Sequence, residues 1–143
     1  MRKSIGWYQT NSPRPSWLSH NLFPGHNINS LYTRKNQMEI LTIILKSKKL
    51  AHNYLNKYHL QRGHLAAKSD FVYSIEQNST FTLANAAPQW SSFNSGNWKY
   101  IETAIQKFVI SNNLSVYIYT GVHGQMTLCD KNRNKQPIYL STV

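Results

Sequence analysis

Cysteine is almost absent from this chain, which holds Cys129 and no other among its 143 residues. One thiol excludes an intramolecular disulfide framework and a zinc site built from several thiolates. No stretch is long and apolar enough to span a bilayer. Residues 1–9 carry the positive charges with which a signal peptide begins, but no apolar run follows them, so the sequence predicts no secretory signal.

Carboxylates are also scarce. Five Asp and Glu residues stand against sixteen Lys and Arg, which gives a formal net charge of +11. Such an excess favours a polyanionic partner, nucleic acid before an acidic membrane surface, although a basic surface that only confers solubility is the alternative. Apolar residues make up 41% of the chain and aromatic residues 13%, which argues for a packed core and against disorder. The length predicts a single domain, or part of one, over residues 1–143.

Local patterns predict an α+β fold. Prolines and a glycine between residues 10 and 30 predict an irregular N-terminal arm over residues 1–30. Asn36 to Glu39 resembles a capping box and predicts a helix to about Lys46, although the β-branched run 42–44 leaves a strand open there. Short β-prone segments predict strands at residues 71–75, 80–84, 115–120 and 137–140.

A second helix is expected from Gly96 to about Ser111, with Asn94 or Ser95 as its N-cap. Helical spacing predicts that one face of it points to the core, namely Trp98, Ile101, Ile105 and Phe108. The order of the elements favours antiparallel hairpins over alternating βαβ units.

Residues 61–102 concentrate the candidate chemistry. A neutral His64 suits the role of general base, although a lone histidine is more often structural. Arg62 can neutralise a phosphate with two parallel hydrogen bonds, and Gly63 permits close approach of backbone to a ligand or simply a tight turn. Asn85 precedes Pro88 in a turn; it either serves that turn or orients the histidine or a phosphate.

Asn94 and Glu102 are candidates for a metal site. The amide oxygen of Asn94 is a hard donor suited to Mg²⁺, and an ordinary N-cap is the alternative. Glu102 can hold a metal-bound water, or it can be a solvated helix charge. Five dispersed carboxylates do not suit a two-metal site, whereas one metal and a histidine base need far fewer. A metal-free mechanism also remains open, because further histidines are present at His52, His59 and His123. The chain has neither a Gly-x-Ser-x-Gly elbow nor a phosphate-binding P-loop.

Ordered blocks of residues resemble the DNA/RNA non-specific endonuclease family, in a form similar to arthropod secreted nucleases, including insect enzymes that degrade double-stranded RNA. The likeness covers roughly residues 14–140. Its blocks are Arg62-Gly-His-Leu65, Asp70-Phe71, Asn85-Ala-Ala-Pro-Gln89, Phe93-Asn94, Gly96-Asn-Trp98 and Ile101-Glu102.

This resemblance implies the ββα-metal (His-Me finger) fold with a mixed, mainly antiparallel sheet. It also implies Mg²⁺-dependent cleavage, with Mn²⁺ as a substitute ion, that leaves 5′-phosphate ends on single- or double-stranded DNA and RNA. Matched block by block, His64 is the base, Asn94 the direct metal ligand and Glu102 a carboxylate acting through metal-bound water. Arg62 and Asn85 match positions that contact the phosphate or support the histidine.

Backbone contacts are expected from Lys68, Lys99, Lys107 and Gln106, and they would carry no sequence preference. The chain departs from the family at Gln61, where many members have Asp, and at Gln106, where bacterial members have an arginine that Lys107 would replace. The family also implies secretion, and its domains usually continue beyond Ile138 to Leu140, so we expect a C-terminally truncated domain. A basic remnant that binds nucleic acid without cutting it is therefore the alternative function.

Overall fold

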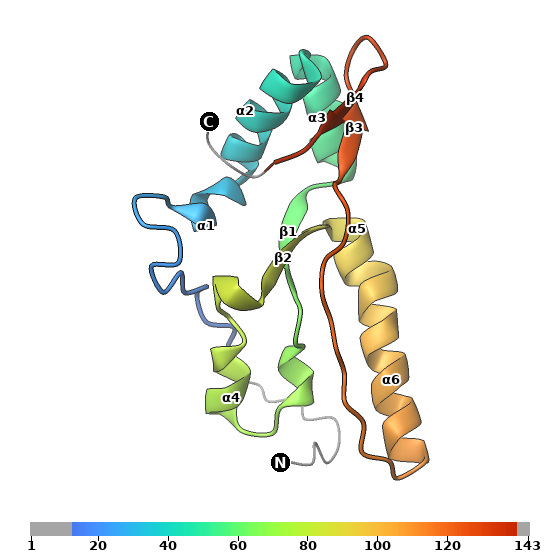
Figure 1. Cartoon of the computed structure of the whole chain (residues 1–143). Coiled ribbons are helices and arrows are strands. Elements are labelled where there is room, and N and C mark those ends of the chain that lie inside the picture. Colours follow the sequence, from blue (N-terminus) through green and yellow to red (C-terminus); the bar gives the residue numbers. More distant parts are fainter. Residues whose placement is uncertain (1–12, 140–143) are drawn as a thin grey trace.

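The computed structural model describes residues 13–139 and has an α+β architecture (Figure 1). Its helices are α1 (Ile28–Leu31), α2 (Arg34–Leu45), α3 (Lys48–Lys57), α4 (Ser74–Ser79), α5 (Ser91–Phe93) and α6 (Lys99–Ser111). Its strands are β1 (Leu60–His64), β2 (Ala86–Trp90), β3 (Thr127–Cys129) and β4 (Lys135–Pro137). These strands form two separate antiparallel pairs, β1 with β2 and β3 with β4, whereas the resemblance implied a mixed, mainly antiparallel sheet. None of the helices in the described part is long and apolar enough to cross a membrane.

The main core lies where α2 and α3 pack on the start of β1 and on the chain after β4 (Figure 1). It consists of Leu41, Leu45, Ala51, Leu55, Leu60 and Ile138. Full burial of a leucine side chain contributes about 1.5–3 kcal/mol, so these side chains dominate the stability of this half of the molecule.

The predicted helix over residues 36–46 is confirmed as α2, although it begins two residues earlier. Its N-cap is Thr33, whose side chain accepts a hydrogen bond from the backbone of Asn36, and it ends at Lys46 in the left-handed conformation. The capping-box interpretation therefore misplaced the cap.

The β1–β2 pair positions the site. Arg62 lies opposite Pro88 and His64 lies opposite Ala86 in the register of this pair. The start of β1 is fixed to α2 by the buried Gln37, whose Oε1 accepts from the backbone N–H of Leu60 at 2.8 Å and whose Nε2 donates to the carbonyl of Leu60 at 2.9 Å.

Three predicted strands are wrong. The segment 71–75 enters α4 instead, because the buried Gln77 donates from its side chain to the carbonyl of Phe71 and so closes a local turn. The segment 80–84 makes one isolated bridge, Leu18 to Thr82, and then a 3₁₀ turn. The segment 115–120 is extended alongside α6 but has no ladder partner among residues 13–139, and without a partner an alternating pattern gives no sheet (Figure 1).

The strand predicted at residues 137–140 is also misplaced. β4 ends at Pro137, and Ile138 goes into the core instead, while Leu140 lies outside the described residues. The expected irregular arm is observed over residues 13–27, apart from the bridge residue Leu18; α1 begins at Ile28, and residues 1–12 lie outside the described part.

The predicted second helix is confirmed as α6, but two details of it are wrong. Asn94 does not cap it, because Asn94 already has helical dihedral angles and opens a π-type turn that leads into α6. Its apolar residues do not all face the core either, since Ile101 is 47% exposed and Phe108 is 57% exposed. α6 packs instead beside the extended segment 115–120, which covers only part of its surface.

Candidate active site

A groove of about 890 Å³ brings most of the predicted site residues together. It lies between the N-terminal arm, β1, the segment that follows β1 and the first turns of α6. Seven of the nine predicted residues line it: Arg62, His64, Lys68, Asn94, Lys99, Glu102 and Gln106. These residues are up to 44 positions apart in the sequence. The antiparallel pairing of β1 with β2 reverses the direction of the chain, so that the following α6 lies next to His64.

His64 is the last residue of β1, and its ring is packed between aromatic side chains. The ring centroids of Trp17 and Phe81 lie 4.6 and 4.7 Å from that of His64. Burial, with the positive charges of Arg14 and Lys68, lowers the pKa of His64 to about 4. The imidazole is therefore neutral at pH 7, and its buried Nε2 has no hydrogen-bond partner among the described residues. A buried ring nitrogen without a hydrogen-bond partner is unusual in a folded protein and points to a functional role.

Arg62 precedes His64 by two positions, so both side chains lie on one face of β1. Its Nη1 donates to Oδ1 of Asn29 at 2.6 Å, and its guanidinium lies 5.1 Å from the ring centroid of Tyr32 and 5.6 Å from that of Trp17. Burial lowers the pKa of Arg62, although the group stays charged at neutral pH. Two rings and one amide thus hold a cation at the groove.

Asn94 faces Gln61 across the groove. The amide nitrogen of Asn94 donates to Oε1 of Gln61 at 2.9 Å. This bond orients the amide and leaves its oxygen without a donor among the described residues. The π-type turn Asn94–Trp98, with a non-helical Gly96, allows Asn94 to serve the groove instead of capping α6.

Glu102 lies in the first turn of α6 and is half-buried in the groove. Burial first, and then the charge of Asp70, raise the pKa of Glu102. Gln106, one turn further along α6, donates from Nε2 to Ser69 Oγ and to Asp70 Oδ1, both at 2.8 Å. Gln106 therefore anchors α6 to the 3₁₀ turn Lys68–Asp70 after β1, and its neutral amide supplies no positive charge to the groove.

Asn85 and Lys107 do not line the groove. The side chain of Asn85 accepts from the backbone N–H of Ala66 at 2.9 Å and donates to the carbonyls of Ala66 and Thr80, both at 3.0 Å. It therefore fixes the loop that follows His64, and none of these hydrogen bonds goes to the histidine ring. Lys107 is exposed on the outer side of α6.

The described residues contain no group of three or more His, Cys, Asp and Glu side chains that could hold a metal ion. A metal in this groove would thus depend on amide and carboxylate oxygens together. Asn94 and Glu102 supply one hard oxygen donor each, which suits an ion such as Mg²⁺ that keeps most of its water ligands.

The order and spacing of these groups match a known family. The family model for DNA/RNA non-specific endonucleases matches residues 4–140. The chain belongs to this family. The chain is also similar to a salivary endonuclease of Lutzomyia longipalpis, with 30% identity over 133 residues. That alignment covers 93% of this chain and 32% of the relative, so the chain spans about a third of its relative's length. No solved structure matched.

Several groove residues of this endonuclease-family chain were not predicted from the sequence. Trp17 and Tyr32 form the walls around His64 and Arg62, and Asn29 holds Arg62. Trp17 lies in an irregular arm and Tyr32 follows the short α1, so no periodicity marks either. His59, which the sequence suggested only as a further histidine for a metal-free mechanism, also lines the groove. Its Nε2 lies 3.1 Å from Nε2 of Gln61. His52 and His123 do not line it.

Proposed function

We propose that this chain is an endonuclease that hydrolyses phosphodiester bonds of DNA and RNA, single- or double-stranded, and leaves 5′-phosphate ends. The observation that carries the proposal is the groove in which a neutral His64 with an unpartnered Nε2 lies together with Arg62, Asn94 and Glu102. Family membership and the salivary relative support the same reaction class.

In this proposal His64 takes a proton from the attacking water. The neutral imidazole required for that step is favoured by burial and by the nearby positive charges, which lower the pKa of His64 to about 4. Arg62 neutralises charge that develops on the phosphate, and its contacts with Asn29, Tyr32 and Trp17 hold it in place before the substrate arrives.

Mg²⁺ is the cofactor we propose, with Mn²⁺ as a substitute. Asn94 would hold it directly and Glu102 through water, because both line the groove and both offer hard oxygens. When bound, such an ion supplies Lewis-acid stabilisation of phosphate charge. Gln61 would keep the amide oxygen of Asn94 turned toward the groove.

We also propose a ββα-metal fold for the part of the chain that carries the groove. β1 and β2 are antiparallel, the chain passes directly from β2 into the helical segment that ends in α6, and His64 and Asn94 lie on the strand and the helical part respectively. This order of elements supports the proposed fold, and the two-stranded β1–β2 pair is its sheet component in the described residues.

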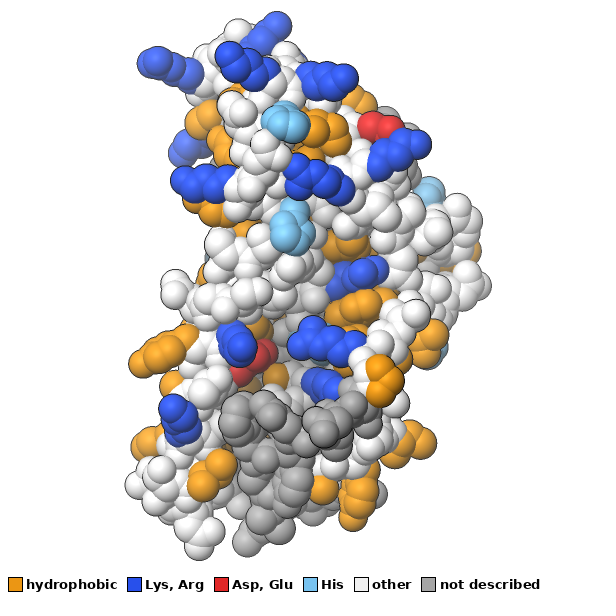
Figure 2. All heavy atoms as spheres, turned by 180° about the vertical axis from the view of Figure 1, so that it is seen from behind, with side chains coloured by type: hydrophobic (Ala, Val, Ile, Leu, Met, Phe, Trp, Pro, Cys, Tyr) orange, Lys and Arg blue, Asp and Glu red, His pale blue; other side chains and the backbone are white. Residues whose placement is uncertain are grey.

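The positive charge of the chain supports binding of DNA and RNA through their sugar-phosphate backbone. Lys and Arg side chains are spread over the face shown in Figure 2, with few acidic side chains among them. Lys68 and Lys99 line the groove and can contact phosphates. Lys107 lies outside the groove, and the amide of Gln106, which does line it, is bonded to Ser69 and Asp70. Contacts of this kind weaken as salt is raised. The relative is a salivary protein, which supports an extracellular site of action for this chain.

The experiment is incubation of the purified chain with plasmid DNA and with double-stranded RNA, in Mg²⁺ and in EDTA. We expect cleavage in Mg²⁺, none in EDTA, and a loss of several orders of magnitude in His64→Ala with binding retained. Full activity in EDTA would favour a metal-free mechanism, for which His59 is the second histidine in the groove. Salt-sensitive gel retardation without products would instead identify a binding remnant.

A further inference from the structure

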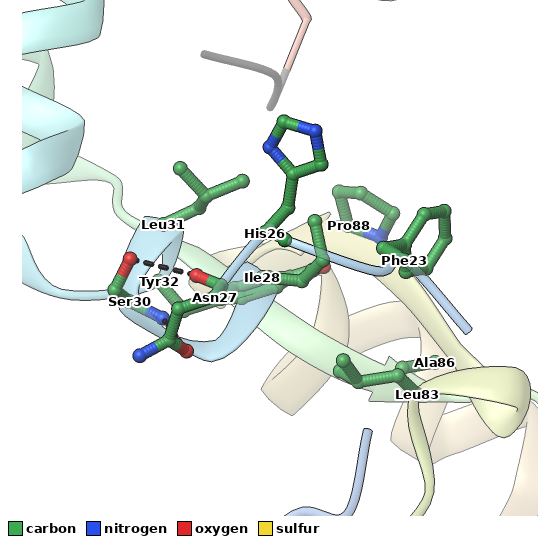
Figure 3. Close-up of a pocket in the computed structure, with 11 residues that line it drawn as sticks. Phe23, His26, Asn27, Ile28, Ser30, Leu31, Tyr32, Leu83, Ala86 and Pro88 are labelled. Carbon is green, nitrogen blue, oxygen red and sulfur yellow. Dashed lines mark hydrogen bonds between the residues drawn. The ribbon is translucent and has the colours of Figure 1, made fainter. Parts of the chain in front are cut away.

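A second cavity of about 570 Å³ lies beside the groove (Figure 3). The segment before and within α1 forms one wall, through Phe23, His26 and Ile28. The start of the 3₁₀ turn Leu83–Asn85 and the strand β2 form the other wall, through Leu83 and Pro88. Its size falls within the range of small-molecule pockets, about 300–1,000 Å³. Among the residues with a part in the proposed reaction, Tyr32 alone also lines this cavity.

Two observations connect the cavity to the proposed catalytic groove. Tyr32 lines both hollows, with the guanidinium of Arg62 lying 5.1 Å from its ring centroid. The register of the β1–β2 pair also places Pro88 directly opposite Arg62 and Ala86 directly opposite His64. Directly opposed residues share a face of an antiparallel pair, with Cβ atoms about 4.5–5.5 Å apart. A molecule in the cavity therefore lies next to the groups proposed to handle the phosphate.

The chemistry of the walls identifies what fits there. Phe23, Leu83 and Pro88 are apolar, and the polar side chains of His26 and Asn27 are exposed at the rim. Asn27 accepts from the backbone N–H of Ser30, which leaves its amide N–H groups free to donate. Among the described residues that line the cavity there is no Lys or Arg, so it does not suit a phosphate. An uncharged, flat, aromatic group with a polar edge suits it.

We propose that this cavity takes one unstacked nucleobase of the strand whose phosphate lies in the groove; this rests on the proposed function. Phe23 offers the stacking surface, and Asn27 and His26 meet the polar edge of the base. A stacking surface accepts every base, so the subsite adds affinity without sequence specificity. A base inside a duplex must leave its stack to enter, which makes single-stranded substrate the better ligand.

The first test measures binding. Ligand-observed NMR would compare a nucleoside 5′-monophosphate with ribose 5-phosphate, which carries the same phosphate and sugar without a base. We expect the mononucleotide to bind the wild-type chain about tenfold more tightly and Phe23→Ala to remove that advantage, since stacking on one aromatic side chain contributes about 1–3 kcal/mol and 1.4 kcal/mol is tenfold. Phe23 is 49% exposed, so its replacement leaves the core intact.

Leu22→Ala is the matched control, because Leu22 is 47% exposed, adjacent in sequence and not part of the cavity wall. It should keep the full preference for the mononucleotide. Equal binding of the two probes to the wild-type chain, or an equal loss in Leu22→Ala, would overturn the subsite.

A second measurement separates this subsite from the proposed activity. Cleavage of a single-stranded oligonucleotide would be compared with cleavage of one that carries an abasic site beside one linkage. We expect the wild-type chain to cut the linkage beside the abasic site about tenfold more slowly than the others, and Phe23→Ala to cut all linkages alike. Cleavage of every linkage at one rate by the wild-type chain would overturn the subsite and leave the nuclease proposal standing. A wild-type chain that cuts nothing but prefers the mononucleotide through Phe23 would overturn the activity alone.

Discussion

Gln61 on β1 accepts a hydrogen bond from the side chain of Asn94, with 2.9 Å between Oε1 and Nδ2. The bond joins the strand that carries His64 to the turn that opens α6, across 33 positions of sequence. It also fixes the orientation of the Asn94 amide, since the nitrogen is used as a donor and the oxygen stays available as an acceptor. Gln61 is therefore a positioning residue for the proposed metal ligand, at the place where many family members have Asp.

We expect Gln61→Ala to weaken the proposed Mg²⁺ site. Loss of a hydrogen-bond partner behind a metal ligand typically costs 10–100-fold in metal affinity or activity, so the Mg²⁺ concentration giving half-maximal cleavage should rise by about tenfold or more. Gln61→Glu keeps an oxygen acceptor and should restore most of the affinity. A Gln61→Ala chain with an unchanged Mg²⁺ midpoint would show that Asn94 needs no such support.

In the pH profile of cleavage, we expect the loss of activity on the acid side to occur at a much lower pH than the pKa of an ordinary histidine would give. The base works in its neutral form, and a pKa lowered to about 4 keeps His64 neutral until the pH falls that far. We expect kcat/KM to stay level between pH 8 and about pH 5 and to fall near pH 4. A profile that declines from pH 6.5 would contradict the buried, positively surrounded environment of His64.

Lys68→Met tests the cause of that shift. Lys68 is one of the two positive charges that lower the pKa of His64, so its removal should move the acid limb toward higher pH. Because Lys68 is also a proposed phosphate contact, the midpoint of the pH profile is the quantity to compare, not the rate. Lys107→Met removes an equal charge from an exposed position outside the groove and should leave the midpoint unchanged.

The gathering of the candidate site residues in one groove was more predictable than the fold around them. The types and order of His64, Arg62, Asn94 and Glu102 carry their chemistry in the sequence, and all four line one groove. The roles of Gln61 and Trp17 were not predictable, because each depends on which distant segment lies opposite it. The structural role of Asn85 was not predictable either. Its amide is hydrogen-bonded to the backbone of the loop after His64, and the residue does not line the groove.

The sequence predicted α2 from a cap-like pattern at residues 36–39 and α6 from the helical spacing of its apolar residues. The short segments 71–75, 80–84 and 115–120 are β-prone but do not pair as strands, because strand propensity depends on packing against a neighbouring strand. β1 was not predicted, because Leu60 to His64 contains no β-branched residue and no Phe, Tyr or Trp; its pairing with β2 and its contacts with Gln37 make it a strand.

Gln37→Ala should test how far β1 depends on α2. Gln37 is 2% exposed, and its side chain satisfies the backbone N–H and C=O of Leu60 and the carbonyl of Tyr32. Its removal leaves buried backbone groups unpaired at about 1–3 kcal/mol each, so the free energy of unfolding should fall by about 2–4 kcal/mol in urea denaturation. The exposed Lys35→Ala on the same helix should change it by less than about 0.5 kcal/mol. A loss below about 1 kcal/mol in Gln37→Ala would mean that water replaces the glutamine.

Gly63 lies on β1 between Arg62 and His64, directly under the side chain of Gln89. A Cβ atom at Gly63 would overlap Cδ and Oε1 of Gln89, the side chain that packs over it from β2. Gly63→Ala should therefore lower the free energy of unfolding by about 1–3 kcal/mol, as overpacking typically does, and should lower kcat by displacing the residues on either side.

Gln89→Ala removes the obstacle at little cost, because Oε1 of Gln89 is buried without a hydrogen-bond partner. The double variant Gly63→Ala/Gln89→Ala should then be more stable than Gly63→Ala, with a coupling free energy of about 1 kcal/mol or more in the four-protein cycle. Recovery of kcat together with stability would show that the glycine serves close packing of the two strands. Additive losses would place the requirement for glycine in the backbone or at the substrate, not at Gln89.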